Sequence, residues 1–390
     1  MSEWKKVKFL DVVHLNPRIS LEKGVEYPFV EMSNVVPCAR KPEKDVFKKY
    51  LGEGTKFEQG DTIVARIEPC LQNGKGFQCS YKQGFGSTEF LVFRPVNIND
   101  LDCDFLYYYM GQQSIREAMA KTMVGASGRQ RVNNKVFNDL QINLPPLSTQ
   151  HRIANILSRY DSLIENYQKQ IKLLEEAARR LYKEWFIDLR FPGHENTKIV
   201  DGLPEGWERK SVGEIGEYLN GFAFKPSDWQ ELGKPIIKIK EMGNGVTNDT
   251  PRNNGERVPA KYLIKAGDLL FSWSATLMVI IWSGEDGWLN QHLFKVTPAK
   301  GINREFLLQS ISNTIVEFQN LTTGSTMKHI QRNKLDQVFV NVPNAEIMKR
   351  YTDISEKTRS NILSLQSQIR LLTEARDRLL PKLMSGEITV

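Results

Sequence analysis

Two stretches of the chain have the spacing of apolar residues that a long, paired helix requires. In the first, residues 148–190, apolar side chains recur at alternating steps of four and three. Such steps place a narrow apolar seam along one side of a helix, as in coiled coils. The seam consists of Ile153, Leu157, Tyr160, Ile164, Tyr167, Ile171, Leu174 and Leu181. The pattern predicts a helix whose narrow seam suits a second helix better than a broad domain core.

The second stretch, residues 344–390, repeats the first. QIKLLEEAARRL begins at Gln170 and QIRLLTEARDRL at Gln368, so the copies lie 198 residues apart and share eight of twelve letters. In the same frame the seam continues at Ile362, Leu365, Ile369, Leu372 and Leu379, and it is interrupted at Ser355, Thr358 and Arg376. Each helix could cover its own domain's core, but the narrow seam favours pairing of the two helices.

The segments that precede the two helices, residues 1–147 and 191–343, also resemble each other. FEQGDTIVAR matches IKAGDLLFSW, STEFLVFRP matches NQHLFKVTP, and the segment that begins GASGRQR matches the one that begins GSTMKHI, in the same order. Short apolar runs between Gly, Pro and Asn predict strands and turns, with helix near residues 105–119 and 304–318. The chain is therefore predicted to be α+β, with two similar domains that each precede a long helix.

Chain connectivity decides how the two helices pair. A helix of about 40 residues is roughly 60 Å long, whereas a domain of about 150 residues is only some 40 Å across. A parallel pair would force the second domain to bridge the whole helix length between its own ends. We therefore expect an antiparallel two-helix coiled coil with one domain at each end, a dumbbell with a pseudo-twofold axis.

Composition narrows the class of protein. The 390 residues are 40% hydrophobic and 25% charged, and no run of about 18 uncharged apolar residues or apolar signal core occurs, so we expect a cytoplasmic protein without membrane contact. The four cysteines have no C-x-x-C spacing, which favours reduced structural thiols. The net charge of +7 is compatible with an anionic partner.

Motifs for catalysis are missing from the sequence. The chain has no P-loop, no dinucleotide fingerprint and no complete methylase motif, since NPR at Asn16 and NLPPL at Asn143 match the last only in part. The five histidines are scattered without metal-ligand spacing. We expect no catalytic residues and no bound metal, and a recognition or scaffold role.

The order of several phrases resembles one known family over nearly the whole chain. The phrases are GLPEGWERKSVGEIGEYLNGFAFKPSDW, GDLLFSW, LNQHLFKV, LPPLSTQHRIANIL and QIKLLEEAARRLYKEWF. In this order, with the pattern doubled, they resemble the specificity subunits of type I restriction-modification enzymes. The resemblance implies target-recognition domains at 1–147 and 191–343 and conserved helices at 148–190 and 344–390.

The resemblance also implies the activity and the partners. A subunit of this family reads an asymmetric bipartite site in double-stranded DNA and has no catalytic activity of its own. Two modification subunits would bring S-adenosylmethionine and methylate adenine N6, and restriction subunits would translocate and cut DNA with ATP and Mg²⁺. The paired helices would act as a ruler between the half-sites.

Candidate DNA contacts are basic, amide and aromatic residues on glycine-rich loops at corresponding places in the two halves. In the first domain they are Arg66, Gln72, Asn73, Lys75, Ser127, Arg129, Gln130 and Arg131. In the second they are Phe224, Lys225, Trp273, Ser274, Thr276, Ser325, Lys328, His329 and Arg332.

Three alternatives remain open from the sequence. The aromatic residues Tyr182, Trp185 and Phe186 could dock a partner subunit, but packing against the second domain is favoured because the helix must be anchored there. The whole chain could be a DNA-binding scaffold or regulator without a methylase partner. It could also be the recognition module of a single-chain nuclease-methylase, which the lack of catalytic motifs disfavours.

Overall fold

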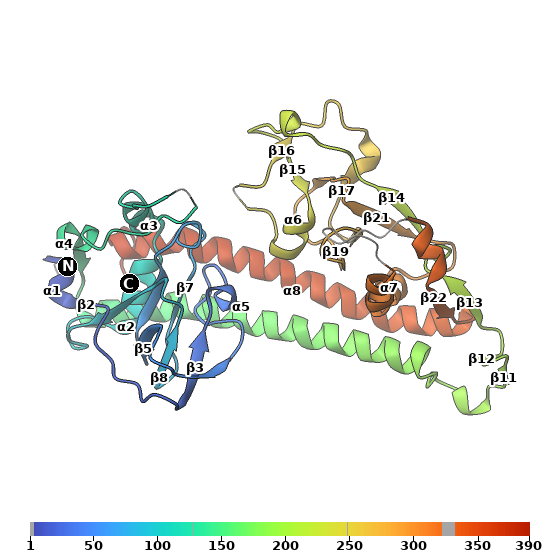
Figure 1. Ribbon diagram of the computed structural model, residues 1–390, viewed down its shortest axis with the longest axis horizontal. Coiled ribbons are helices and arrows are strands. Elements are labelled where there is room, and N and C mark those ends of the chain that lie inside the picture. Colours follow the sequence, from blue (N-terminus) through green and yellow to red (C-terminus); the bar gives the residue numbers. More distant parts are fainter. Residues whose placement is uncertain (1–3, 127, 248, 322–331) are drawn as a thin grey trace. The chain divides into compact units, whose positions relative to one another are not determined.

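The computed structural model describes residues 4–126, 128–247, 249–321 and 332–390. The chain divides into two compact units, Met1–Asn166 with Ile369–Val390, and Tyr167–Gln368. Each unit thus contains one of the two predicted domains and one end of each long helix (Figure 1). No helix among the described residues has both the length and the apolar character needed to cross a bilayer.

The first unit is built around two four-stranded sheets and a short two-stranded one (Figure 1). The first sheet has the order β2(Val13–Leu15), β9(Phe90–Pro95), β6(Thr62–Ala65), β7(Gly76–Gln78). The second has the order β4(Phe47–Lys49), β3(Glu26–Val30), β8(Gln83–Gly86), β5(Thr55–Glu58), and β1(Lys5–Lys8) pairs with β10(Gln141–Leu144). The helices are α1(Phe9–Val12), α2(Cys103–Gly111), α3(Gln113–Ala120) and α4(Val136–Asp139).

The second unit repeats these three sheets and adds one further strand pair. Its sheets have the orders β14(Gly216–Asn220), β21(Leu293–Pro298), β18(Leu269–Ser272), β19(Met278–Ile281) and β16(Arg252–Asn253), β15(Lys234–Ile237), β20(Gly287–Leu289), β17(Leu263–Ile264). Two strand pairs complete the unit: β13(Glu208–Ser211) with β22(Phe339–Val342), and β11(Ile199–Val200) with β12(Leu203–Pro204). Its helices are α6(Ile239–Asn244) and α7(Arg304–Asn320). In both units the second sheet has one parallel pair, β3 with β8 and β15 with β20. The two-domain repeat predicted from the sequence is confirmed.

The repeated Gly-Asp of the two matching phrases forms the turn that leads into a fully buried strand. The Asp61 carboxylate accepts the N–H of Glu58 at 2.8 Å, and Asp268 accepts the N–H of Lys265 at the same distance. Each aspartate also pairs with a basic side chain of the neighbouring strand, Asp61 with Arg94 at 2.6 Å and Asp268 with Lys295 at 2.7 Å. The turn therefore fixes where β6 and β18 begin.

The two long helices are α5(Leu147–Tyr182), continued by a π-helical turn (Lys183–Ile187), and α8(Ala345–Ser385). In the first unit the early residue Asp161 of α5 meets the late residue Arg376 of α8. In the second unit Trp185, just beyond the end of α5, meets the early residue Tyr351 of α8, with ring centroids 6.0 Å apart. An early residue of α5 thus meets a late residue of α8 in the first unit, and the end of α5 meets an early residue of α8 in the second, as the predicted antiparallel pairing requires.

Burial along the helices follows the predicted seam. Of the thirteen seam residues, Ile153, Leu157, Ile164 and Ile362 are buried and the others are half-buried. Two of the residues that interrupt the apolar pattern, Ser355 and Arg376, are buried as well. The interruptions therefore do not break the helix pairing, because these polar side chains find partners, as described below.

Candidate nucleic-acid interface

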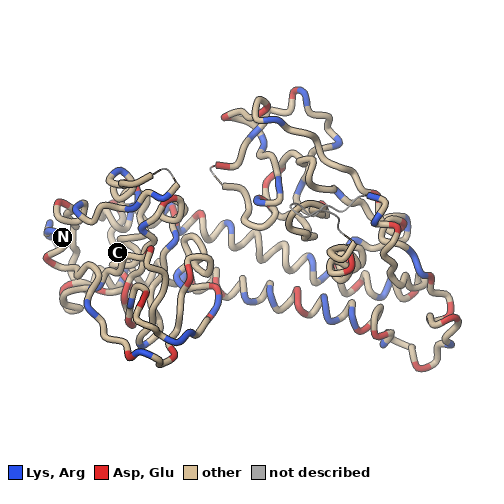
Figure 2. The backbone as a smooth tube through the Cα atoms, viewed as in Figure 1, with Lys and Arg blue, Asp and Glu red and all other residues tan. Residues whose placement is uncertain are grey.

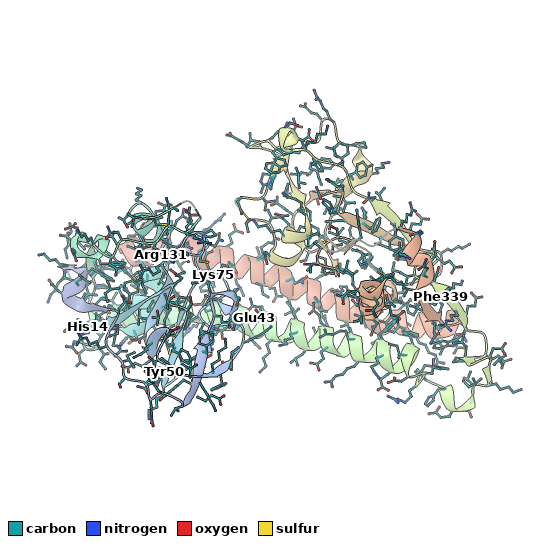
Figure 3. All side chains as sticks on the ribbon, viewed as in Figure 1. His14, Glu43, Tyr50, Lys75, Arg131 and Phe339 are labelled. Atoms are coloured by element: carbon teal, nitrogen blue, oxygen red, sulfur yellow. The ribbon has the colours of Figure 1, made fainter. Side chains whose placement is uncertain are left out.

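Two loops singled out from the sequence of the first domain meet at the end of strand β6. Strand β6 pairs with β9 up to Ala65 and Phe90, and Arg66 follows directly. The Arg66 carbonyl accepts the N–H of Val132 at 2.9 Å, and the Glu68 N–H donates to the Gln130 carbonyl at 3.0 Å. The loop 66–75 and the loop 124–135 therefore form one surface corner, which we call the β6 corner. Lys75 and Arg131, from these two loops, are labelled in Figure 3.

A carboxylate that was not singled out from the sequence organises the β6 corner. Glu89, the residue before β9, receives two donors of Arg131, with Nε–Oε2 at 2.8 Å and Nη2–Oε1 at 2.6 Å. The Glu89 carbonyl also accepts the N–H of Arg66 at 2.9 Å. The hydrogen bonds from Arg131 lower the pKa of Glu89, burial opposes them, and the charges of Arg131 and Arg66 add to the lowering. The Glu89–Arg131 pair is therefore charged near neutral pH.

Among the other candidate DNA contacts of the first domain, some side chains hydrogen-bond within the protein and others are exposed. Gln72 donates to Glu68 at 2.9 Å, and Lys75 donates to the Met32 carbonyl at 2.8 Å. Arg129 is exposed at the tip of the second loop, Asn73 is exposed and Gln130 is half-buried. Ser127 lies outside the described residues.

The second domain has a corner at the corresponding place, with different chemistry. Strands β18 and β21 pair up to Ser272 and Leu293, so Trp273 and His292 occupy the places of Arg66 and Glu89. The Trp273 N–H donates to the His292 carbonyl at 3.4 Å, and the two rings lie 5.8 Å apart. The Trp273 indole N–H donates to the Asn220 side chain at 3.2 Å. We call this cluster the β18 corner; it is aromatic where the β6 corner is charged.

At one side of the β18 corner, the backbone of Asn290 lies so close to Gly221 that there is no room for a side chain at residue 221. A Cβ on Gly221 would lie 2.1 Å from the Asn290 carbonyl oxygen. This close approach lets the Gly221 N–H reach the Leu293 carbonyl at 3.0 Å. The glycine that follows Asn220 therefore holds this side chain beside the Trp273 ring.

Two candidates in the second domain need correction. Phe224 is only 8% exposed and packs with Ile236, Val258 and Trp288, and Ser274 is buried. Both were expected on the surface because they lie in glycine-containing or polar loops, but the chain turns these side chains inward, so neither is placed to contact DNA. Of the other candidates, Lys225, Thr276 and Arg332 are exposed. Ser325, Lys328 and His329 lie outside the described residues.

Glu89, His292 and Asn220 are the corner residues that sequence reasoning missed. Glu89 and His292 lie in the matched phrases STEFLVFRP and NQHLFKVTP, three letters in. The signal was available, because residues at equal places in a repeat with different chemistry are candidates for different recognition. Only the strand register places these residues beside the loops.

In the first unit, the seam interruption Arg376 joins the two long helices and the domain. The Arg376 guanidinium donates to Asp161 at 2.7 Å and to the Cys38 carbonyl at 3.1 Å. The Tyr108 hydroxyl donates to the other oxygen of Asp161 at 2.5 Å. Burial alone would lower the pKa of Arg376, but the hydrogen bond and charge of Asp161 raise it overall. This buried network fixes the helix pair to α2.

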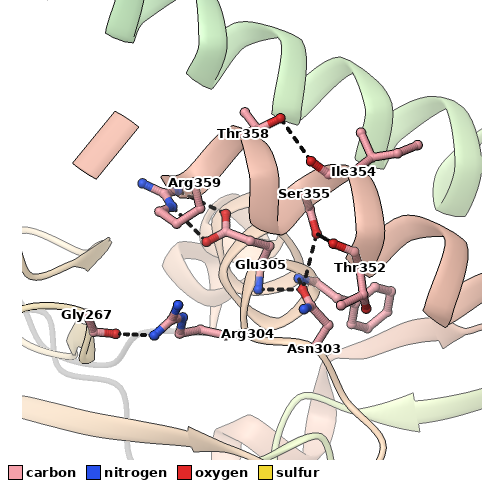
Figure 4. Close-up of polar contacts among 10 residues, drawn as sticks. Gly267, Asn303, Arg304, Glu305, Thr352, Ile354, Ser355, Thr358 and Arg359 are labelled. Atoms are coloured by element: carbon pink, nitrogen blue, oxygen red, sulfur yellow. Dashed lines mark hydrogen bonds and ion pairs between the residues drawn. The ribbon is translucent and has the colours of Figure 1, made fainter. Parts of the chain in front are cut away.

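In the second unit, a buried ion pair and an aromatic cluster join α8 to the domain, and Figure 4 shows the polar contacts around the ion pair. Arg359 donates to both oxygens of Glu305, at 2.7 and 3.0 Å. Asn303 caps α7 by accepting the N–H of Glu305 at 2.8 Å, and Ser355 donates to the same Asn303 oxygen at 3.5 Å. Tyr182, Trp185 and Phe186 are buried in this domain's core. The expectation that the aromatic residues pack within the protein is therefore confirmed.

Charge along the long helices is mixed. Lys and Arg alternate with Asp and Glu on α5 and α8 (Figure 2). Among the described residues no group of three or more His, Cys, Asp or Glu side chains could hold a metal ion.

Comparisons with known proteins agree with the doubled fold. The family model for the type I restriction modification DNA specificity domain matches residues 1–176 and 204–370. The chain is 23% identical over 468 residues to the HindI specificity subunit of Haemophilus influenzae, with all of both chains covered. It is 25% identical over 308 residues to the MjaIX specificity subunit of Methanocaldococcus jannaschii, covering 74% of this chain and 69% of that one.

A solved structure shows the same fold. The type I restriction-modification S subunit of M. genitalium matches with a TM-score of 0.51 and 16% identity, over 98% of this chain and 96% of that chain. The family model matches well over half of the sequence, once in each half. The chain therefore belongs to the type I restriction-modification DNA specificity family, and it carries the family's domain twice.

Proposed function

We propose that this chain is the DNA-recognition subunit of a type I restriction-modification complex and reads an asymmetric bipartite target. One observation carries the proposal: the same sheet corner occurs once in each domain, but holds Arg66, Glu89 and Arg131 in one and Asn220, Trp273 and His292 in the other. Side chains with different hydrogen-bonding groups read different base edges. Each domain therefore reads its own half-site.

The reactions that follow recognition belong to partner subunits in this proposal. Two modification subunits bind S-adenosylmethionine and methylate adenine N6 in each half-site. Restriction subunits use ATP and Mg²⁺ to translocate and cut unmethylated DNA. The chain itself has no catalytic residues and acts in the cytoplasm on double-stranded DNA.

The paired helices serve as a ruler in this proposal. Helices of 36 and 41 residues extend for roughly 54 and 62 Å at about 1.5 Å per residue. One turn of B-DNA is about 34 Å, so a rigid helix pair of this length suits half-sites one to two turns apart. Arg376 joins both helices to the first domain, and Arg359 joins α8 to the second, so each end of the proposed ruler is attached to a domain.

The exposed face of the helices offers a place for the modification subunits. Leu173 and Leu371 occupy the same place in the repeated phrase, and each is 56% exposed. Large apolar residues exposed at equivalent places suit two copies of one partner. Replacing both by glutamate should release the modification subunits while DNA binding by the chain persists.

The test is a methylome. The chain is co-produced with its modification subunit in cells without adenine methylation, and N6-methyladenine is mapped by single-molecule sequencing. The proposal expects one asymmetric bipartite motif, methylated in both halves. Absence of methylation, with the complex formed and the modification subunit shown to be competent, would contradict it and favour a DNA-binding scaffold.

A further inference from the structure

The β6 corner contains a pre-oriented arginine. Arg131 is held on both sides of its backbone, since its N–H donates to the Val124 carbonyl and its carbonyl accepts the Val124 N–H, both at 3.0 Å. Its side chain lies along the carboxylate of Glu89, yet remains 45% exposed, against 23% for Glu89. Hydrogen bonds therefore hold both the backbone and the side chain of Arg131, while part of the side chain remains exposed to solvent.

The donors that Glu89 uses leave the other edge of the guanidinium available. An arginine has five N–H donors in a rigid fork. Glu89 engages the edge made by Nε and Nη2. Both N–H groups of Nη1 and the second N–H group of Nη2 are not used by Glu89. The edge made by Nη1 and Nη2 can therefore donate to two acceptors in one plane. Guanine offers such a pair, O6 and N7, in the major groove.

We propose that Glu89 is a positioning residue that holds Arg131 for recognition of a guanine in the half-site read by the first domain. This rests on the function proposed above. A flexible arginine must lose side-chain freedom when it binds a base, whereas one already held by a carboxylate has lost that freedom beforehand. Pairing with Glu89 also fixes the plane of the fork.

Two further observations agree with a reading site at this corner. Arg66 lies beside the pair, half-buried, and its Nε has no hydrogen-bond partner among the described residues. The two loops and Glu89 carry five basic side chains (Arg66, Lys75, Arg129, Arg131 and Lys135) against two acidic ones (Glu68 and Glu89), so the corner is positively charged, as an approach to DNA requires. In the second domain, the place of Glu89 is taken by His292, which cannot hold an arginine in this way. Among the described residues, this arginine–carboxylate pair is therefore found at the β6 corner and not at the β18 corner.

The experiment uses the full chain with its modification subunit and three variants. Glu89→Gln removes the carboxylate charge, and Arg131→Lys keeps the positive charge but loses the fork. Glu184→Gln is the matched control, because Glu184 forms a similar two-point pair with Arg190, at 2.6 Å twice, outside both recognition corners. Binding is measured by competition among duplexes in which each base of the methylome-defined target is replaced in turn. Thermal unfolding checks that each variant is folded.

We expect Glu89→Gln and Arg131→Lys to reduce discrimination at one guanine of the first half-site by about 10-fold. Preference at the second half-site, and all preferences of Glu184→Gln, should stay as in the unmodified chain. If Glu89→Gln does not fold, Arg131→Lys decides alone. The inference is overturned if the first half-site contains no guanine, if preference is unchanged, or if affinity falls equally for all sequences, as for a phosphate contact. A missing motif in the unmodified chain would instead reject the proposed function.

Discussion

At the scale of single residues, the two domains carry different side chains at equivalent places of the same strand pairing. Arg66 and Trp273 follow equivalent strands, and Glu89 and His292 precede equivalent partners. The backbone hydrogen bond between each pair is retained, at 2.9 and 3.4 Å. The two domains thus share this backbone pairing and differ in the side chains that it presents.

The Glu89–Arg131 pair predicts a pH dependence of stability. Because the hydrogen bonds of Arg131 lower the pKa of Glu89, the pair stabilises the folded state above the ordinary carboxyl value of 4.5. That contribution is lost as the pH falls through the lower pKa of the folded state. Urea unfolding of the unmodified chain and of Glu89→Gln between pH 7 and pH 3.5 should show a stability difference that shrinks at the acid end. A difference that grows on acidification would contradict the assignment.

Gly221 gives a second prediction at this scale. Gly221→Ala would place a Cβ 2.1 Å from the Asn290 carbonyl oxygen, so the backbone of the β18 corner must shift. We expect a loss of about 1–3 kcal/mol in the free energy of unfolding. Gly243→Ala is the control, because a Cβ there would lie 3.9 Å from its neighbour, Met278, on the exposed side of α6. Equal effects of the two substitutions in urea unfolding would show that the close approach is not responsible.

At the scale of elements, buried ion pairs join the long helix α8 to its surroundings, and one of them, at Arg376, lies where the apolar seam is interrupted. Arg376 and Arg359 are both buried on α8, each bound to an acid of the same unit. A buried ion pair adds little net stability compared with apolar packing, but losing one partner is costly because the other charge is left buried. Such pairs specify which partner and which register the helix accepts.

Arg376→Ala tests this account. It leaves Asp161 buried without its cation, and we expect a loss of about 3–5 kcal/mol in the free energy of unfolding. The double variant Asp161→Leu/Arg376→Met should recover most of that loss. Arg378→Ala removes an exposed arginine paired with Glu374 one turn away, and should cost less than about 0.5 kcal/mol. Denaturant unfolding distinguishes these outcomes, and an equal loss in the single and double variants would argue against a buried-charge penalty.

At the scale of the whole molecule, the ruler hypothesis makes a quantitative prediction. One heptad inserted after Gln168 in α5 and another after Gln366 in α8, at equivalent places of the repeat, would lengthen the helix pair by about 10 Å. That length corresponds to about three base pairs. The methylome should then show the same two half-sites with a spacer about three base pairs longer. An unchanged spacer, with methylation retained, would show that the helices do not set it.

Much of this architecture could be read from the sequence, for a local reason. The heptad steps predicted both long helices, because helical periodicity needs only neighbouring residues. The repeated phrases predicted two similar domains, and chain connectivity predicted antiparallel pairing. The loops 66–75 and 124–135 were also recognised as candidate contacts. These inferences depend on short-range patterns or on the repeat itself.

Only the tertiary structure decided which side chains meet. The parallel pairing of β3 with β8, the inward turn of Phe224 and the approach of Glu89 to Arg131 join residues that no local period connects. Arg376 looked like a break in the seam, because apolar periodicity cannot show that Asp161 lies opposite. The sequence by itself determined the helices, the repeat and their order. Burial and long-range hydrogen bonding determined which polar residues hold the structure together and which remain exposed.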